Sequence, residues 1–153
     1  MNWFNKPKIT HEPLSETNSI LYDESTSYNR LKQDLLEAKQ EVIIESPFIA
    51  TRRLEMLKSV FEILVNRGVQ FFIVTRDPHE HEYKSMSKQA EAGIRYFETL
   101  GVQVLLCSGG HHRKLAIIDR KVLWEGSLNI LSQTKSREIM RRIDGQEYAI
   151  EML

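Results

Sequence analysis

Residues 112–129 read HRKLAIIDRKVLWEGSLN and contain two short apolar runs, LAII and VLW, on either side of the charged sequence DRK. Apolar runs of this length between polar residues are typical of buried strands, and a short polar connection makes two such strands neighbours in a hairpin. We therefore expect a strand over 113–119, a tight turn at Arg120 and Lys121, and a second strand over 122–125. A loop and a short helix are expected to start at Gly126.

The chain before this hairpin alternates between amphipathic segments and continuous apolar runs. Two of the amphipathic segments end at glycines, Gly68 and Gly101, which suit the left-handed residue that closes many helices. The expected helices cover about 27–38, 54–65 and 86–100, and the expected strands cover 42–44, 69–75 and 102–107. Helices and strands in alternation predict a sheet that is at least partly parallel.

The chain after the hairpin offers one more strand, over 137–143, and a short terminal helix over 145–153. Together these elements predict an α/β fold with a mixed β-sheet flanked by helices on both faces. Residues 1–24 are polar, carry Pro7 and Pro13, and are expected to form an N-terminal arm or linker. Residues 25–153 are expected to form one domain, since a chain of 153 residues matches the size of a single core.

The bulk composition is that of an ordinary globular protein, with 21 Lys and Arg residues against 21 Asp and Glu residues and a net charge of zero. Attraction to phosphates must therefore come from a local group of cations. The single cysteine, Cys107, cannot form a disulfide within the chain, which fits a reducing compartment. No apolar run approaches the roughly 20 residues of a membrane span, and the N-terminus lacks the apolar core of a secretory signal. A cytoplasmic protein is expected.

The hairpin and its flanks carry side chains suited to phosphodiester chemistry. Residues two apart on a strand share a face, so His112 and Lys114 are expected to project together. A neutral imidazole can attack phosphorus, and the Lys114 ammonium and the Asn129 amide can hold the oxygens of the crowded, negatively charged transition state. Gly126 allows close approach of the backbone, and Ser127 can add a hydroxyl or an N–H donor.

A second group must protonate the leaving alcohol, and the chain contains no second H-x-K pattern to supply it. The other histidines, none of which has a lysine two residues on, are His11, His79, His81 and His111. A symmetric site built from this one motif would require two chains.

The sequence HRKLAIID followed by GSLN resembles the HKD motif of the phospholipase D superfamily. The resemblance implies a homodimer in which two motifs meet at a two-fold axis, with no metal and no cofactor. His112 of one chain would be the nucleophile and His112 of the other the general acid, while Lys114 and Asn129 of both chains would bind the phosphate. The segments ESPFIATRR at 45–53 and EIMRR at 138–142 also resemble phospholipase D-like domains attached to some DNA helicases and restriction enzymes.

The same resemblance implies an acidic residue downstream of the GSLN segment that orients the nucleophile. Glu138 is the best positional match, and Glu147 is its rival. Asp119 belongs to the motif but lies at odd spacing from His112 along the strand. We expect Asp119 to stabilise the turn or the dimer interface rather than to take part in the chemistry.

Three arginines are candidates for contact with a polyanionic substrate. Arg52 and Arg53 follow the strand end near Ser46, where open α/β sheets place their ligands, and Arg76 follows the next strand. His79 and His81, with acidic neighbours, are expected to be solvated loop residues rather than metal ligands.

The sequence thus predicts a metal-independent endonuclease that cleaves DNA through a phosphohistidine at a homodimeric site. The basic pairs favour nucleic acid over lipid, and the chain shows no amphipathic helix suited to a bilayer. A phospholipase or cardiolipin-type hydrolase is the alternative enzyme. A weakly active, dimerising nucleic-acid-binding module of a helicase or restriction system is the alternative from another class.

Overall fold

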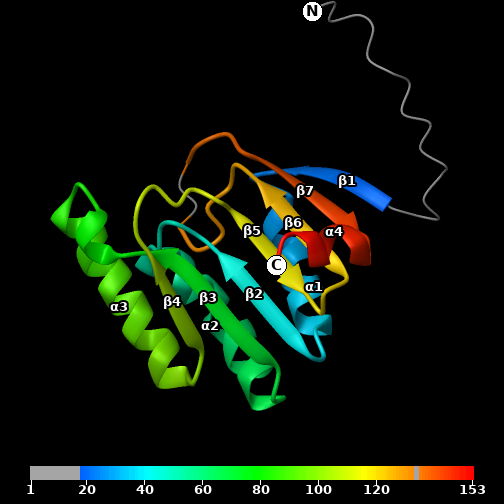
Figure 1. The fold of residues 1–153 in the computed structure, drawn as a ribbon, viewed down its shortest axis with the longest axis horizontal. Coiled ribbons are helices and arrows are strands. Elements are labelled where there is room, and N and C mark those ends of the chain that lie inside the picture. The colour runs from blue at the N-terminus through cyan, green and yellow to red at the C-terminus, as the bar shows by residue number, and fades with distance from the viewer. Residues whose placement is uncertain (1–17, 133–134) are drawn as a thin grey trace, which may run out of the picture.

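The computed structural model describes residues 18–132 and 135–153, which form a seven-stranded sheet and four α-helices (Figure 1). The strands are β1 (Asn18–Asp23), β2 (Glu41–Glu45), β3 (Gln70–Arg76), β4 (Gln103–Cys107), β5 (Leu115–Ile118), β6 (Val122–Gly126) and β7 (Ile139–Asp144). The helices are α1 (Ser27–Glu37), α2 (Thr51–Asn66), α3 (Lys84–Leu100) and α4 (Gln146–Glu151), with one 3-10 turn, η1 (Pro78–Glu80).

The order of strands across the sheet is β1-β7-β6-β5-β2-β3-β4. Strands β2, β3 and β4 are parallel, and every other neighbouring pair is antiparallel. As a result, the carboxyl ends of β1, β2, β3, β4 and β6 lie at one edge of the sheet together with the amino ends of β5 and β7. We call this row of strand ends the motif edge, which is distinct from the edge strands β1 and β4. The connections from β4 to β5 and from β6 to β7 both lie there.

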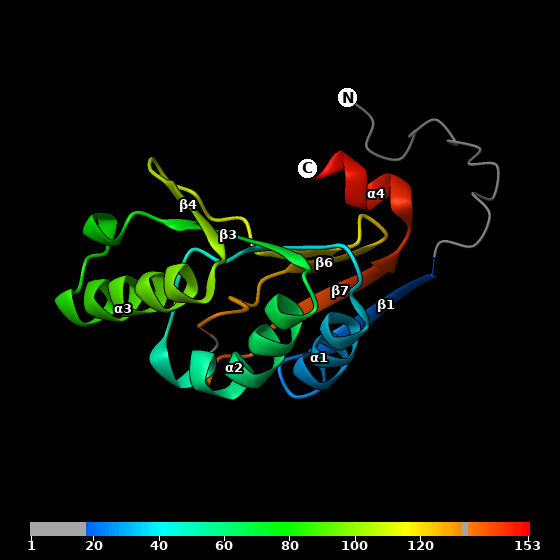
Figure 2. The same cartoon turned by 90° about the horizontal axis from the view of Figure 1, so that it is seen from below.

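Helices cover both faces of the sheet, as the sequence predicts, but unequally (Figure 2). Helices α1, α2 and α3 pack on one face over a core that includes the fully buried Phe61, Phe97 and Trp124. The short helix α4 covers part of the other face, where Ala149 packs with Leu115 and its neighbours. The fold class is therefore confirmed: a mixed sheet in an α/β sandwich. Among the described residues, no helix combines the length and apolar character needed to cross a bilayer.

A buried ion pair fastens α1 to the strands that carry the second half of the motif. The Asp34 carboxylate, which is 3% exposed, accepts hydrogen bonds from Trp124 Nε1 at 2.8 Å and from Arg142 Nε at 2.6 Å. The hydrogen bond with Asp34 raises the pKa of Arg142. Because the carboxylate is fully partnered, its burial is compensated, and α1 is fixed against β6 and β7.

Several predicted boundaries are wrong in detail. Residues 18–23, which the sequence places in the arm, form β1 and pair with β7; residues 1–17 lie outside the described part of the chain. The first strand of the hairpin begins at Leu115 rather than at 113. The short helix expected from Gly126 is not present in 127–132 or 135–138, where the backbone makes turns and bends, and residues 133–134 lie outside the described ranges.

The hairpin turn is centred one residue earlier than predicted. Asp119 and Arg120 have positive φ angles of 52° and 55°, and Lys121 N donates to Ile118 O at 3.0 Å. This is the type I′ geometry that matches the twist of two-residue hairpins. An aspartate tolerates the left-handed region better than most residues, which explains why the turn falls on Asp119 rather than on Lys121.

Candidate active site

The side chains proposed to carry the reaction come from two connections that cross the motif edge. One connection runs from β4 to β5 and the other from β6 to β7, and β5 and β6 are paired neighbours. The residues that these connections bring to the motif edge are His112, Lys114, Gly126, Ser127, Asn129 and Glu138. The sheet therefore unites groups that lie up to 26 positions apart in the sequence.

His112 and Lys114 lie in the extended segment immediately before β5. The Lys114 ammonium donates to the backbone oxygen of His112 at 3.0 Å, so its charge lies beside the proposed nucleophile. His112 is exposed and Lys114 is half-buried. Arg113 takes the opposite direction, since its guanidinium pairs with Glu45 at 3.1 Å and donates to Met152 O on the α4 side. The alternation expected for a strand therefore extends through this segment.

Gly126 and Ser127 fasten the start of the second connection to β7. Ser127 N donates to Ile139 O at 3.0 Å, and Ile139 N donates to Ser127 Oγ at 3.0 Å. A Cβ atom at Gly126 would lie 2.2 Å from Ile139 O, so only glycine fits there. The close backbone approach that Gly126 allows is thus made to β7, and the Ser127 N–H donates within the fold.

Glu138 lies between two serines and close to Lys114. Hydrogen bonds from Ser127 and from Ser136, the latter at 2.6 Å, hold the pKa of Glu138 below its ordinary value, and the charge of Lys114 acts in the same direction. The carboxylate therefore stays ionised at the pH of any ordinary assay. Glu147, the alternative at the sequence level, begins α4 beyond the far end of β7, away from the motif edge.

The motif edge also concentrates buried polar atoms that make no hydrogen bond. In the described part of the chain these atoms belong to Ser27, Glu45, Arg53, Arg76, Glu80, His81, Tyr96, His111 and Asn129. All except Tyr96 lie at strand ends, in connections or in helix starts on the motif edge. Among them is the side-chain oxygen of Asn129. Two of these groups still have an ion-pair partner, since Glu45 Oε2 lies 3.1 Å from Arg113 Nε and Glu80 Oε2 lies 3.8 Å from Arg76 Nε. Buried polar groups are normally partnered, so the remaining ones, such as the Asn129 oxygen, are groups that a ligand can complete.

Asp119 lies at the opposite edge, where its carboxylate is fully used. It accepts backbone N–H groups of Lys39 at 2.9 Å, Gln40 at 2.8 Å and Glu41 at 2.9 Å. Partial burial raises the pKa of Asp119, but these three donors and the charge of Lys121 outweigh it, and the pKa is lowered. Asp119 thus links the hairpin turn to the connection between α1 and β2.

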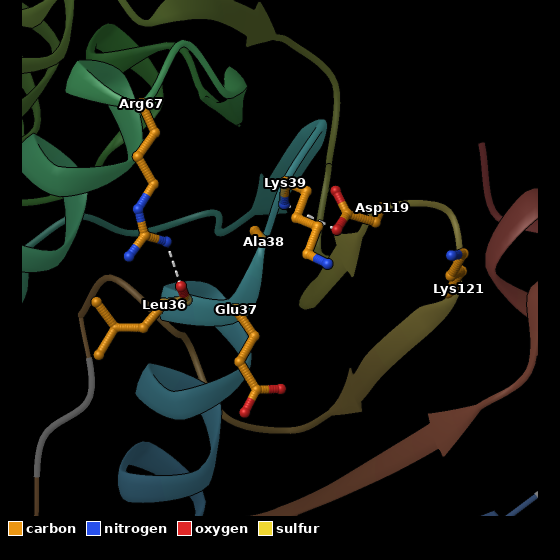
Figure 3. Close-up of a pocket in the computed structure, with 7 residues that line it drawn as sticks. All are labelled: Leu36, Glu37, Ala38, Lys39, Arg67, Asp119 and Lys121. Atoms are coloured by element: carbon orange, nitrogen blue, oxygen red, sulfur yellow. Dashed lines mark hydrogen bonds between the residues drawn. The ribbon is translucent and has the colours of Figure 1, made fainter.

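A surface cavity of about 800 Å³ lies beside Asp119 at this opposite edge (Figure 3). Its lining includes Lys39, Lys121 and Arg67, and the Arg67 guanidinium donates to Leu36 O at the end of α1. The groups proposed for chemistry are at the other end of β5, so this cavity is separate from the candidate site.

The three candidate arginines differ in their surroundings. Arg52 is exposed in the first turn of α2. Arg53 is half-buried, with its guanidinium carbon 3.8 Å from the centre of the Tyr28 ring. Arg76 ends β3, forms an ion pair with Glu80 at 3.8 Å, and thus already has a counterion. All three lie at the motif edge, yet only the first two carry a charge that is uncompensated within the described residues.

The loop histidines are held by local contacts. His79 Nδ1 lies 2.9 Å from Asp77 Oδ1, and this hydrogen bond raises the pKa of His79. His81 stacks on Phe48 with ring centres 5.2 Å apart, and burial, with a smaller effect of Arg76, lowers the pKa of His81. Within residues 18–132 and 135–153, no three His, Cys, Asp or Glu side chains are grouped so that they could hold a metal ion.

Two residues that adjoin the site carried no signal in the sequence. Glu24 Oε2 accepts the backbone N–H of Glu138 at 3.1 Å, although the two residues are 114 positions apart. Tyr28, in the first turn of α1, donates its hydroxyl to Ile130 O at 2.7 Å. Contacts of this range depend on the pairing of β1 with β7 and on the packing of α1, neither of which is visible in local patterns.

Solved structures that resemble the chain include the following three. NucT from Helicobacter pylori superposes with a TM-score of 0.71 at 21% identity, covering 90% of this chain and 91% of that one. Nuc from Salmonella typhimurium, a phospholipase D family member, gives 0.70 at 20% identity with 90% of each chain covered. TrmBL2, an archaeal chromatin protein with a novel mode of DNA binding, gives 0.58 at 16% identity, covering 92% of this chain and 51% of that one. At these identities the likeness concerns the fold.

No curated protein matches the chain. The sequence of residues 31–152 matches a family described as cardiolipin synthase, phospholipase D-like domain. This match spans every strand except β1 and includes the whole HKD-like segment. The chain therefore belongs to the phospholipase D-like family.

Proposed function

We propose that the chain is a metal-independent phosphodiesterase, an endonuclease that cleaves DNA through a phosphohistidine intermediate at a homodimeric active site. The observation that carries this proposal is the gathering of His112, Lys114, Asn129 and Glu138 at one edge of a phospholipase D-like domain. The same edge concentrates the buried polar atoms that make no hydrogen bond. His112, Lys114, Asn129 and Glu138 together offer a nucleophile, a cation, an amide and an ionised carboxylate, a set that can cleave a phosphodiester without a metal.

In the proposed reaction a ring nitrogen of His112 attacks phosphorus and forms a P–N bond while the P–O bond to the leaving alcohol breaks. The Lys114 ammonium and the Asn129 amide stabilise the negative charge on the remaining phosphate oxygens. The second copy's His112 protonates the leaving oxygen. It then takes a proton from the water that attacks the phosphohistidine, so His112 of the first chain is released unchanged.

Glu138 is proposed to keep the Lys114 and Ser127 side chains in position as an ionised carboxylate. Its low pKa and its two serine donors support this role. The family resemblance assigns an orienting contact with the nucleophilic imidazole to the matching acid. Within the described part of one chain, no hydrogen bond joins Glu138 to His112, so that contact would form on assembly or on substrate binding.

The incompletely covered face of the sheet supports self-association. Beside α4 lies a depression of about 320 Å³ whose apolar lining includes Phe72, Val74 and Leu105. Leu105 on the edge strand β4 is 47% exposed. Exposed apolar surface of this kind favours an interface, and an interface that reaches the motif edge would bring two His112 rings to one phosphate.

The choice of DNA rests on the cations at the motif edge and on the character of the structural neighbours. Arg52 and Arg53, at the start of α2, have no counterion among residues 18–132 and 135–153, so their charges are available to a polyanion. Arg76 lies at the same edge and joins them as a candidate contact, although Glu80 partly neutralises it. TrmBL2, a neighbour of the same fold, is itself a DNA-binding protein.

The test is a substrate panel in the presence of EDTA, comparing the wild-type chain with Lys114→Ala. Single- and double-stranded DNA, RNA, and vesicles containing cardiolipin are the four substrates. We expect DNA cleavage in chelator that Lys114→Ala lowers by about 10²–10³-fold, the effect of one stabilising donor. Cleavage of lipid alone would reject the nuclease and favour the alternative enzyme, a cardiolipin-type hydrolase, to which the family description points.

The alternative from another class is a dimerising nucleic-acid-binding module of a helicase or restriction system. The net charge of zero favours it, because a free-standing nuclease usually carries an excess of cations. DNA binding without turnover, unchanged in His112→Asn, would support this module. Acid-labile phosphate trapped on His112 from a labelled substrate would support the enzyme.

A further inference from the structure

The guanidinium of Arg53 is held in place without a counterion. Its central carbon lies 3.8 Å from the centre of the Tyr28 ring, and Nη1 is 3.4 Å from the Met56 sulfur. Its Nε is buried and makes no hydrogen bond. None of the ion pairs among residues 18–132 and 135–153 includes Arg53.

Two contacts fasten this arginine to the connection that carries Asn129. The Tyr28 hydroxyl donates to Ile130 O at 2.7 Å, with a longer contact of 3.4 Å to Asn129 O. Ala50 N, at the start of α2, donates to Leu131 O at 2.9 Å. Arg53 and the backbone of the Asn129 connection therefore contact the same tyrosine, Arg53 over its ring and the backbone at its hydroxyl, which fixes Arg53 relative to the proposed phosphate site.

The fold gains little from a cation at this place. The first turn of α2 contains no acidic residue, and positive charge at a helix amino terminus is unfavourable because the backbone N–H groups already point there. Elsewhere on the same helix, Lys58 also lies over a tyrosine ring, that of Tyr96, but it pairs with Glu55 at 2.6 Å. The uncompensated charge of Arg53 is best explained by an anion that binds with the substrate.

We propose that Arg53, held over the Tyr28 ring, binds the phosphate next to the scissile one in a polynucleotide. This inference rests on the proposed nuclease function and extends it to the substrate class. Lys114 and Asn129 serve the scissile phosphate, whereas Arg53 lies over the ring of Tyr28, whose hydroxyl contacts the Asn129 backbone oxygen. A substrate with several phosphates in a row can use both positions, and a diester with one phosphate can use only the first.

The test compares two substrates and one matched pair of variants. The substrates are a short oligodeoxynucleotide and bis(p-nitrophenyl) phosphate, a diester with a single phosphorus. Arg53→Gln removes the proposed contact, and Lys58→Gln removes another ring-stacked cation of α2 that lies about two turns from the motif edge. We expect Arg53→Gln to raise KM for the oligonucleotide about tenfold with kcat changed less than about twofold, and to leave the single-phosphate diester unaffected.

Salt dependence gives an independent readout on the same proteins. Loss of one phosphate contact should make the plot of log(kcat/KM) against log[salt] shallower by about 0.7 for a single strand, and Lys58→Gln should leave the slope unchanged. An equal loss on both substrates, or no loss on either, would overturn the inference.

A binding assay separates this inference from the proposed nuclease function. Fluorescence anisotropy of the labelled oligonucleotide on a His112→Ala background needs no turnover. If the wild type cleaves neither substrate but Arg53→Gln weakens binding and flattens the salt slope, the nuclease proposal fails and the phosphate contact stands. Binding that is insensitive to Arg53→Gln would remove the contact even if the enzyme is active.

Discussion

The two edges of the sheet use the same motif in opposite ways. At the motif edge, His112 is exposed, the Asn129 side-chain oxygen is buried without a hydrogen bond, and Arg53 lacks a counterion among the described residues. At the other edge, Asp119 accepts three backbone N–H groups, and Arg120 forms a two-pronged contact with Glu41 at 3.0 and 3.3 Å. The Asn129 oxygen and the Arg53 charge at the motif edge thus lack partners among the described residues, whereas the named side chains at the opposite edge have them.

One short motif therefore contains residues with two different roles. His112 and Lys114 are available to a ligand, whereas Asp119 stabilises the fold. The four residues of β5 lie between Lys114 and Asp119, so His112 and Lys114 are at one end of this strand and Asp119 is at the other. Under the proposed function, groups that would meet a ligand, such as the Asn129 side-chain oxygen, lack partners among the described residues, whereas Asp119 and Arg120, which hold the fold, are paired. Substitutions at the two edges should therefore affect different measurements, activity at one and stability at the other.

The largest expected effect is on activity, at the motif edge. His112→Ala should lower kcat at least about a thousandfold, because the nucleophile cannot be replaced by binding groups alone. The unfolding midpoint should stay within about 2 °C of the wild type, since an exposed side chain contributes little to stability. Steady-state cleavage assays and thermal unfolding on the same preparation check both statements. Unaltered turnover would show that His112 is not the nucleophile, and His111 would be the next residue to substitute.

Glu138 should show a smaller effect of the same kind. Glu138→Gln removes the negative charge beside Lys114 and weakens the hydrogen bonds from Ser127 and Ser136, so kcat should fall by at least about tenfold. Glu147→Gln is the matched control, because Glu147 lies at the start of α4, away from the motif edge. Equal losses in the two variants would contradict the assignment of Glu138 to the site.

The opposite edge should respond in stability alone. Asp119→Ala leaves the N–H groups of Lys39, Gln40 and Glu41 without their acceptor, which should cost about 2 kcal/mol of the free energy of unfolding. For a chain of this size that corresponds to a fall of roughly 4–8 °C in Tm. Chemical denaturation measures the loss. Below the new Tm, kcat per folded molecule should match the wild type; a loss of kcat in a well-folded variant would assign Asp119 to the chemistry.

The smallest expected effect is the pH dependence of that stability. The pKa of Asp119 is lowered in the fold from an ordinary value of 3.8. Its contribution to stability is therefore fully present above pH ~4 and is lost as the pH falls through the folded pKa. The difference in unfolding free energy between wild type and Asp119→Asn should narrow between about pH 5 and pH 3. A constant or widening difference would mean that the carboxylate is not held in its ionised form.

Much of the fold and part of the site could be predicted from local patterns. The apolar runs at 42–44, 69–75 and 102–107 mark β2, β3 and β4, and the glycines at 68 and 101 mark where α2 and α3 end. The HKD-like spacing singles out His112, Lys114 and Asn129, which the structure brings to one edge. These features depend on local apolar runs, helix-ending glycines and one motif contained in residues 112–129, so the sequence alone contains them.

What could not be predicted depends on long-range pairing. Strand β1 has three apolar residues, Ile20, Leu21 and Tyr22, between polar ones, and its ladder with β7 identifies it as a strand. Glu24 and Tyr28 adjoin the site through contacts of more than 100 positions. The close backbone approach expected at Gly126 is made to Ile139 O of β7, a partner that the local sequence does not name. In each case the partner residue is absent from the local sequence window.

If two chains share one reaction centre, as proposed, mixing wild-type and inactive subunits should reveal it. Wild type and His112→Ala are unfolded together, refolded at equal amounts and assayed at constant total protein. If each centre needs His112 from both chains, only wild-type pairs are active, and activity should fall to about one quarter of the all-wild-type value. Activity of about one half, declining in proportion to the wild-type fraction, would show that each chain works alone and would contradict the shared centre.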